Sequence, residues 1–93
     1  MKHSFCLSGL LDVSRADTLH GALDALLANE GMVTLEADSV ERIDTSILQL
    51  LVAFKRELNK RGFDLQWANA SDVIIFTARS LGLLEALNLS VQH

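Results

Sequence analysis

The sequence predicts an α/β fold, built as a small mixed, mainly parallel β-sheet of about four strands with three to four helices packed on it. Segments with the period-two alternation of a strand alternate along the chain with segments of helical period. This order favours parallel strands joined by right-handed crossovers. Apolar residues make up 49% of the 93 residues, which suits one core. We therefore expect residues 1–93 to form a single domain.

The N-terminal segment from Ser4 to Val13 is rich in apolar residues and predicts one or two short strands, with Ser8-Gly9 as a turn signal between them. The single cysteine, Cys6, cannot form an internal disulfide and is expected to be a small buried side chain. Ser14-Arg15-Ala16-Asp17 has the pattern of a capping box and predicts the start of a helix.

That first helix carries one apolar stripe, and Gly31 is expected to end it. The stripe consists of Leu19, Ala22, Leu23, Leu26 and Leu27. A second strand is predicted over Met32–Ala37, where alternate residues are apolar. A polar loop over Asp38–Ile43 should follow, with Val40 and Ile43 contacting the core.

The longest helix is predicted from Ile47 to Arg61, and Gly62 is the expected stop. Apolar residues cover most of its first half, so it should be largely buried. Its cations lie near the C-terminal end, where the helix dipole favours positive charge.

A third strand is predicted over Phe63–Trp67, and Trp67 falls in register with its buried side. Asn69-Ala70-Ser71-Asp72 should cap a third helix that continues through Leu81. Gly82 breaks that helix, and a last short helical piece is predicted over Leu83–Leu87.

The turn Asp44-Thr45-Ser46, which enters the long helix, is the candidate functional site. One of the three residues should cap the helix by accepting a hydrogen bond from an amide of its first turn. Capping needs only one such residue, so at least one hydroxyl should point outward. A helix start offers free N–H groups and a partial positive charge, and ligands of open α/β sheets bind beyond the carboxyl ends of the strands.

Charge and composition exclude several classes of function. The net charge is −4 and the basic residues are spread along the chain, so binding to nucleic acid or to an anionic membrane surface is not expected. No apolar run approaches the roughly 20 residues that span a bilayer, and no secretory signal is recognisable, so we expect a cytoplasmic protein without direct membrane insertion.

Enzymatic activity is not expected either. His3, His20 and His93 show no metal-ligand spacing with one another or with Cys6, and the chain has no glycine-rich phosphate loop. Ser46 has no histidine base nearby in the sequence. We therefore predict no metal, no cofactor and no catalytic residue.

Several segments together resemble a known family. They are the strand Val33-Thr34-Leu35-Glu36-Ala37, the turn Ile43-Asp44-Thr45-Ser46 entering Leu48-Gln49-Leu50-Leu51, the helix end from Lys55 to Gly62, and Leu65-Gln66-Trp67-Ala68-Asn69-Ala70-Ser71 leading to Leu81-Gly82-Leu83. In combination they are similar to the STAS domain, the fold shared by bacterial anti-sigma factor antagonists and the cytoplasmic tails of sulfate transporters. The resemblance covers nearly the whole chain and implies a STAS-like fold.

In anti-sigma factor antagonists the matching Asp-Ser-Ser-Gly turn carries a serine that a partner kinase phosphorylates. The resemblance therefore implies phosphorylation of Ser46, with Thr45 as the alternative, while Ile47 stands where the family often has glycine. A phosphate would add roughly −1.5 to −2 charges, and Asp44 and an acidic partner surface would repel it. Modification would thus release the partner.

The leading hypothesis is a non-catalytic regulatory module of bacterial signal transduction. It would bind an anti-sigma factor, a serine-kinase-like protein or another signalling protein through Asp44, Thr45 and Ser46, together with Asn69 and Ser71 of the neighbouring turn. The alternative is a small cytoplasmic STAS subunit of a lipid-transport ABC complex that binds its ATPase subunit without phosphorylation. An adaptor in a chemotaxis or two-component pathway and a small-ligand pocket near the same turns are further hypotheses.

Overall fold

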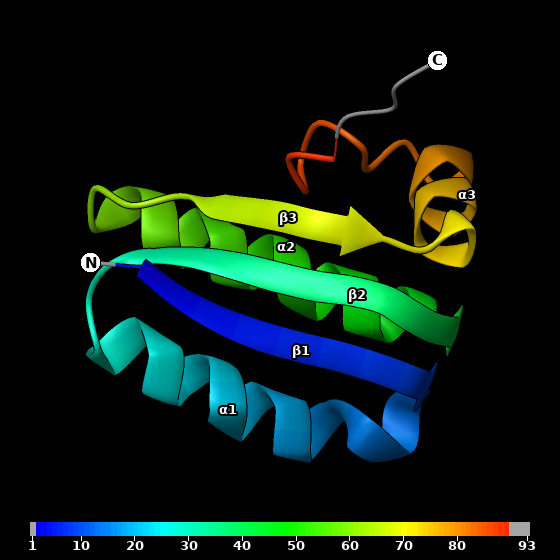
Figure 1. Ribbon diagram of the computed structural model, residues 1–93, viewed down its shortest axis with the longest axis horizontal. Helices are drawn as coiled ribbons and strands as arrows, with labels where there is room; N and C mark the ends of the chain where they lie inside the picture. The colour runs from blue at the N-terminus through cyan, green and yellow to red at the C-terminus, as the bar shows by residue number, and fades with distance from the viewer. Residues whose placement is uncertain (1, 90–93) are drawn as a thin grey trace.

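A computed structural model, which describes residues 2–89, confirms the α/β fold with a parallel sheet (Figure 1). The strands are β1 (Lys2–Leu11), β2 (Met32–Ile43) and β3 (Leu65–Ala70). The helices are α1 (Ala16–Ala28), α2 (Thr45–Lys60) and α3 (Asp72–Ser80), and a short 3-10 helix, η1 (Val13–Arg15), precedes α1. Within residues 2–89 there are three strands rather than the predicted four or so. His93, considered above as a metal ligand, lies outside the described residues.

The strand order is β1-β2-β3, and both neighbouring pairs are parallel. Two right-handed crossovers that step across a sheet in the same direction place both connecting helices on one face. In agreement, α1 packs against α2, and Figure 1 shows α2 behind the sheet with α1 on the β1 side. No helix in the described part of the chain is long and apolar enough to cross a membrane.

The core lies between one face of the sheet and these helices. On the central strand, β2, the inward side chains of Val33, Leu35 and Ala37 are completely buried, as predicted from the alternation. They meet the buried face of α2, where Ile47 and Leu51 are also inaccessible to solvent. This packing confirms the predicted apolar face of α2, which carries six buried side chains.

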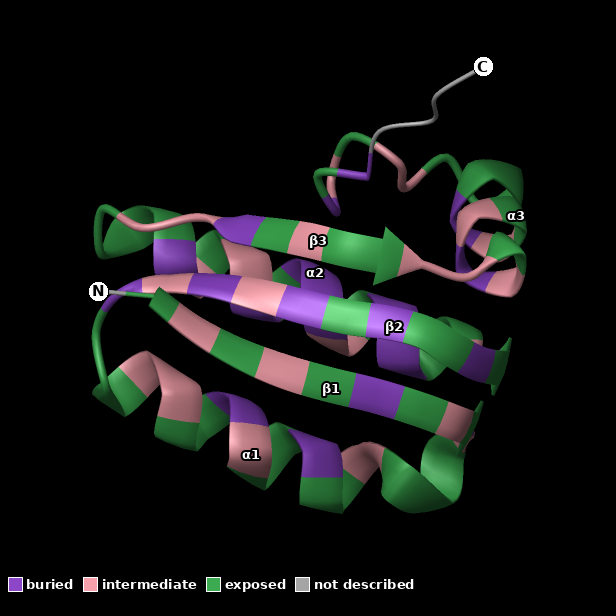
Figure 2. Cartoon of the chain, viewed as in Figure 1, coloured by how far each residue is buried: buried purple, intermediate pink, exposed green. Residues whose placement is uncertain are grey.

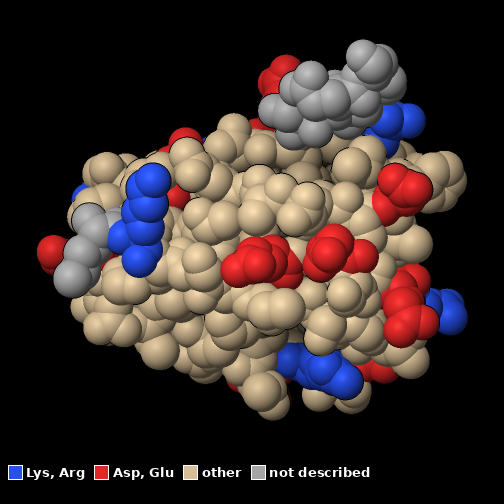
Figure 3. All heavy atoms as spheres, viewed as in Figure 1, with Lys and Arg blue, Asp and Glu red and all other residues tan. Residues whose placement is uncertain are grey.

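The opposite face of the sheet is open and polar. Ser4, Cys6 and Ser8 of β1 are exposed, so the prediction of a buried Cys6 is wrong: its position in the alternation turns it away from the helices. Figure 2 shows this alternation of exposed and buried residues along the strands. Figure 3 shows acidic side chains over the middle of this face, above β2, whose exposed residues include Glu36 and Asp38.

The predicted loop over Asp38–Ile43 is instead the second half of β2. It pairs with the end of β1, from Ser8 opposite Ser39 to Leu11 opposite Ile43. Two register shifts interrupt this pairing, and each inserts an extra residue in β2 that breaks the simple alternation. Val40 and Ile43 are buried, as expected, although they belong to a strand.

The predicted capping box does not form. Asp12 caps η1 instead, because its carboxylate accepts hydrogen bonds from the backbone N–H of Ser14, at 3.0 Å, and from the Ser14 hydroxyl. The hydroxyl hydrogen bond is the main cause that lowers the pKa of Asp12. The helix α1 then begins at Ala16 without a side-chain cap.

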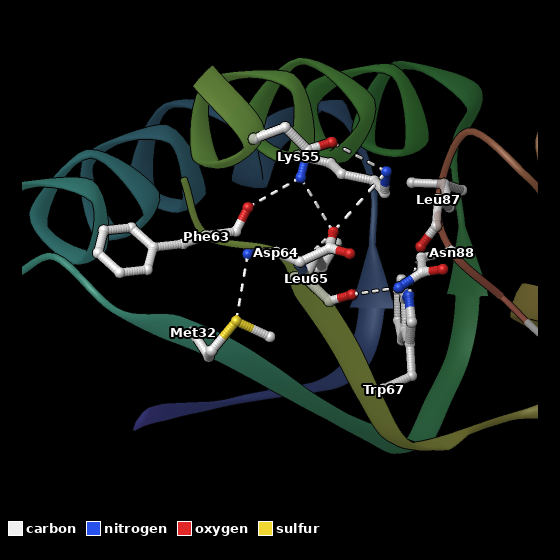
Figure 4. A network of polar contacts seen from close by, with 9 residues as sticks. Met32, Lys55, Phe63, Asp64, Leu65, Trp67, Leu87 and Asn88 are labelled. Carbon is white, nitrogen blue, oxygen red and sulfur yellow. Dashed lines mark hydrogen bonds and ion pairs between the residues drawn. The ribbon is translucent and has the colours of Figure 1, made fainter. Parts of the chain in front are cut away.

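A polar network fixes the entry to β3 (Figure 4). The Asp64 carboxylate accepts hydrogen bonds from Asn59 Nδ2, at 3.1 Å, and from the Leu65 N–H, at 2.8 Å. The Lys55 Nζ atom lies 3.8 Å from the same carboxylate. Partial burial opposes ionisation, but these partners outweigh it and lower the pKa of Asp64. The network therefore holds the end of α2 to the start of β3.

The segment after α3 is fastened across β3 by two side chains. Trp67 Nε1 donates a 2.7 Å hydrogen bond to the Leu87 carbonyl, and Asn88 Nδ2 donates a 2.7 Å hydrogen bond to the Leu65 carbonyl (Figure 4). Trp67 packs on the core, in agreement with its predicted place. The predicted helical piece over Leu83–Leu87 forms turns instead, and Asn88 has a φ of 61°.

The β3 entry network predicts a pH-dependent loss of stability in Asp64→Asn. The lowered pKa means that ionised Asp64 stabilises the fold above its unfolded value of 3.8 and that this contribution disappears as the pH falls through the folded value. We expect the variant to lose about 0.5–1 kcal/mol of unfolding free energy at neutral pH, since Asp64 is partly exposed and solvent screens its charge. Urea unfolding should show this difference shrinking below about pH 4, and a difference that stays constant would contradict the assignment.

Candidate functional site

The Asp44 turn is fastened to the end of β1. Asp44 occupies the N-cap position of α2, but its side chain makes no capping hydrogen bond, so the expected side-chain cap is not formed. Its Oδ2 atom instead accepts a 3.1 Å hydrogen bond from the backbone N–H of Val13. In return, the Asp44 N–H donates a 2.9 Å hydrogen bond to the Leu11 carbonyl. These two bonds hold the start of α2 against the point where β1 gives way to η1.

Thr45 and Ser46, the first two residues of α2, are both exposed. The next residue, Ile47, is completely buried, and so is Leu48. Because these two side chains fix the rotation of the helix about its axis, Thr45 and Ser46 are held on its solvent side. The structure thus presents both predicted hydroxyl-bearing residues on a fixed helix start.

Two exposed apolar residues that are not among the predicted site residues lie in the last part of β1 and at the start of η1. Val13, whose N–H binds Asp44, is 66% exposed, and Leu10 is 53% exposed. One feature of the sequence indicates that Leu10 is exposed. Two successive leucines in a strand point to opposite faces of the sheet, so when Leu11 faces the core, Leu10 faces away from it. We refer to Leu10, Val13, Thr45 and Ser46 as the turn surface.

The second predicted turn lies beside another part of β2. The Ser71 N–H donates a 3.0 Å hydrogen bond to the Ala37 carbonyl, whereas Asp44 follows Ile43, six residues further along β2. Six strand residues extend up to about 20 Å, so the Ser71 turn and the Asp44 turn adjoin well-separated positions along β2. Ser71 accepts a 3.4 Å hydrogen bond from the Ile74 N–H and caps α3, as predicted. Asn69 is exposed and belongs to β3.

No histidine in the described range adjoins the turn surface through a hydrogen bond or ion pair. His3 lies near the start of β1, where its Nε2 atom is 2.7 Å from the Asn29 carbonyl oxygen. His20 lies on α1 and its Nδ1 atom is 3.5 Å from the Asp24 carboxylate. Between residues 2 and 89, no three His, Cys, Asp or Glu side chains gather in a way that could hold a metal ion.

In a comparison with known families, the family model described as "Mlab, STAS domain" matches residues 5–89, from within β1 to Leu89. No curated protein matches the chain.

The hydrogen bond between the Val13 N–H and the Asp44 carboxylate should contribute to the free energy of unfolding. We expect Asp44→Ala to lose about 1–2 kcal/mol of unfolding free energy, because the Val13 N–H loses a charged acceptor. Urea unfolding measures the loss, and amide hydrogen exchange should become faster at Val13 in particular. Glu41→Ala removes an exposed carboxylate from β2, the strand that precedes Asp44, and should change neither quantity. Equal effects of the two substitutions would show that this hydrogen bond does not contribute to stability.

Proposed function

The chain belongs to the STAS domain family, and from this premise we propose that it is a non-catalytic protein-binding module whose docking site is the turn surface. The proposed partner is a signalling protein, such as an anti-sigma factor or a serine-kinase-like protein. STAS domains generally mediate protein–protein interactions, which supports the class of function. The choice of site rests on the geometry of the Asp44 turn.

The observation that carries the proposal is the fixed exposure of the turn surface. Two exposed hydroxyl residues and two exposed apolar residues belong to two segments whose backbones the hydrogen bonds of Asp44 hold together. Interfaces combine apolar contact with a few directed hydrogen bonds, and a surface that is already ordered loses less conformational entropy on binding. Asp44 acts in this proposal as a positioning residue.

Phosphorylation of Ser46 would regulate this docking, with Thr45 as the alternative acceptor. The start of α2 tolerates negative charge because of the helix dipole, so a phosphate there need not unfold the helix. It would nevertheless place roughly −1.5 to −2 charges in the middle of the interface, next to the carboxylate of Asp44. A partner with an acidic binding face would then be released.

A second candidate is the ABC-complex subunit, which would bind its ATPase through the same surface without phosphorylation. The burial of Ile47 favours it. Ser46 already has a helical backbone, and a kinase that requires an extended acceptor segment would have to pull Ile47 out of the core. Exposing a buried isoleucine costs about 1.5–3 kcal/mol. Docking itself requires no such change.

Affinity capture from the native host with paired variants tests the docking site. Ser46→Ala should retain the partner that the unmodified chain retains, whereas Ser46→Asp should retain at least about tenfold less, because a buried unpaired charge is costly in an interface. Ser39→Asp adds the same charge at an exposed serine of β2, outside the turn surface, and serves as the matched control. Full retention by Ser46→Asp would place the docking site elsewhere.

The peptide that contains Thr45 and Ser46 distinguishes the two candidates when the captured complex is analysed by mass spectrometry. A kinase-like ATPase in the eluate, together with a phosphorylated form of this peptide in the free chain, is the result expected for the regulated switch. Membrane-transport subunits with an unmodified peptide would instead identify the ABC-complex subunit.

A further inference from the structure

The outer edge of β1 is open to another strand. β1 is the first strand in the order β1-β2-β3 and pairs only with β2 among the described strands. An edge strand carries a row of unpaired N–H and C=O groups, and proteins usually protect it with charged residues or proline. From Ser4 to Leu11 this strand has neither.

A groove of about 150 Å³ runs along this edge, between β1 and α1. Figure 1 shows α1 lying alongside the free edge. One wall is formed by residues 5–8 and Leu11 of the strand side, and the other by Arg15, Thr18, Leu19 and Ala22. The groove therefore combines the backbone hydrogen-bonding groups of the strand edge with a lining that is mainly apolar as a whole.

An extended polypeptide segment matches this combination better than other occupants. A small apolar molecule would fill the groove but leave the backbone groups of the edge unpaired. A second copy that paired through its own β1 would bring its own α1 toward the same groove, because α1 extends beyond the edge of β1 (Figure 1). A lone strand satisfies the edge and places alternate side chains against α1.

The charges around the groove specify the chemistry of that segment. Arg15 is the only charged residue that lines it, and Lys2 begins the strand at the other end. Figure 3 shows basic side chains where β1 begins and on the α1 side of the face. The Asp12 carboxylate, which accepts hydrogen bonds from Ser14, lies close enough to Arg15 to offset part of its charge. Lys2 and Arg15 nevertheless place one cation at each end of the edge, and both favour carboxylates.

We propose that this groove binds an extended segment of a partner protein, apolar at alternate positions and acidic at both ends, as a fourth strand of the sheet. Its apolar side chains lie against α1, and its outward side chains continue the polar open face. No residue that lines the groove belongs to the turn surface, although Leu11 and Arg15 lie close to it in the sequence, and the proposal does not rest on the proposed function. The groove adds a second contact through which a partner is recognised.

A synthetic peptide of about ten residues tests the site. The peptide alternates valine and threonine, carries a glutamate at each end, and is N-methylated along its outer edge so that it cannot pair with itself. We expect it to shift the amide resonances of β1 and α1 in the full chain and to slow hydrogen exchange along β1. The same peptide with lysine ends should bind about fivefold more weakly. No shifts with the acidic peptide, or shifts centred on the open face or the turn surface, would overturn the proposal.

Two pairs of variants complete the test. Arg15→Glu changes an exposed charge at the rim and should abolish the preference for the acidic peptide, because Lys2 still attracts a carboxylate at one end while the new glutamate repels one at the other. Ala22→Trp should fill the groove and abolish peptide binding. Ala25→Trp changes an exposed position of the same helix that does not line the groove and should not affect peptide binding. Ser46→Asp, in the turn surface, should also leave peptide binding unchanged. Equal affinity of both peptides for the unmodified chain, or an unchanged preference in Arg15→Glu, would contradict the assigned role of charge.

Discussion

The structure depends on one constraint: only one face of the three-stranded sheet is apolar. Leu35 at the centre of that face is fully buried, and it contributes to the same core as Ile47 of α2. The strand order advances in one direction, so right-handed connections bring α1 and α2 to this face together. Parallel sheets are usually covered on both faces, and the polar residues of the other face explain why this sheet remains stable with one face open.

The same constraint determines where the candidate site lies. Because β1 and β2 are parallel and end together, Leu11 and Ile43 are neighbours, and the chain that follows each strand is brought to one place. The carboxylate of Asp44 then joins the two segments through Val13. A residue that resembles a helix cap in the sequence is thereby used as a cross-connection between elements far apart in the chain.

Local sequence patterns predicted those features that depend on nearby residues, such as the buried side of β2, the apolar face of α2 and the Ser71 cap. They failed where contact with a segment far away in the sequence determines the local structure. The second half of β2 exists because β1 pairs with it, and its bulges hide the alternation. The exposure of Thr45 and Ser46 followed from their position at the helix start, whereas the contribution of Val13 depends on a contact across 31 residues of sequence.

The hydrogen bond from Trp67 to the segment after α3 makes the fluorescence of Trp67 a probe of whether that segment is docked. Trp67 is the only tryptophan, and its indole N–H is bonded to the Leu87 carbonyl. Indole emission moves to longer wavelength when the ring becomes hydrated, and detachment of this segment would hydrate the ring. Fluorescence therefore follows the docking of the last turns, while far-ultraviolet circular dichroism follows the rest of the fold, and the two signals need not change together.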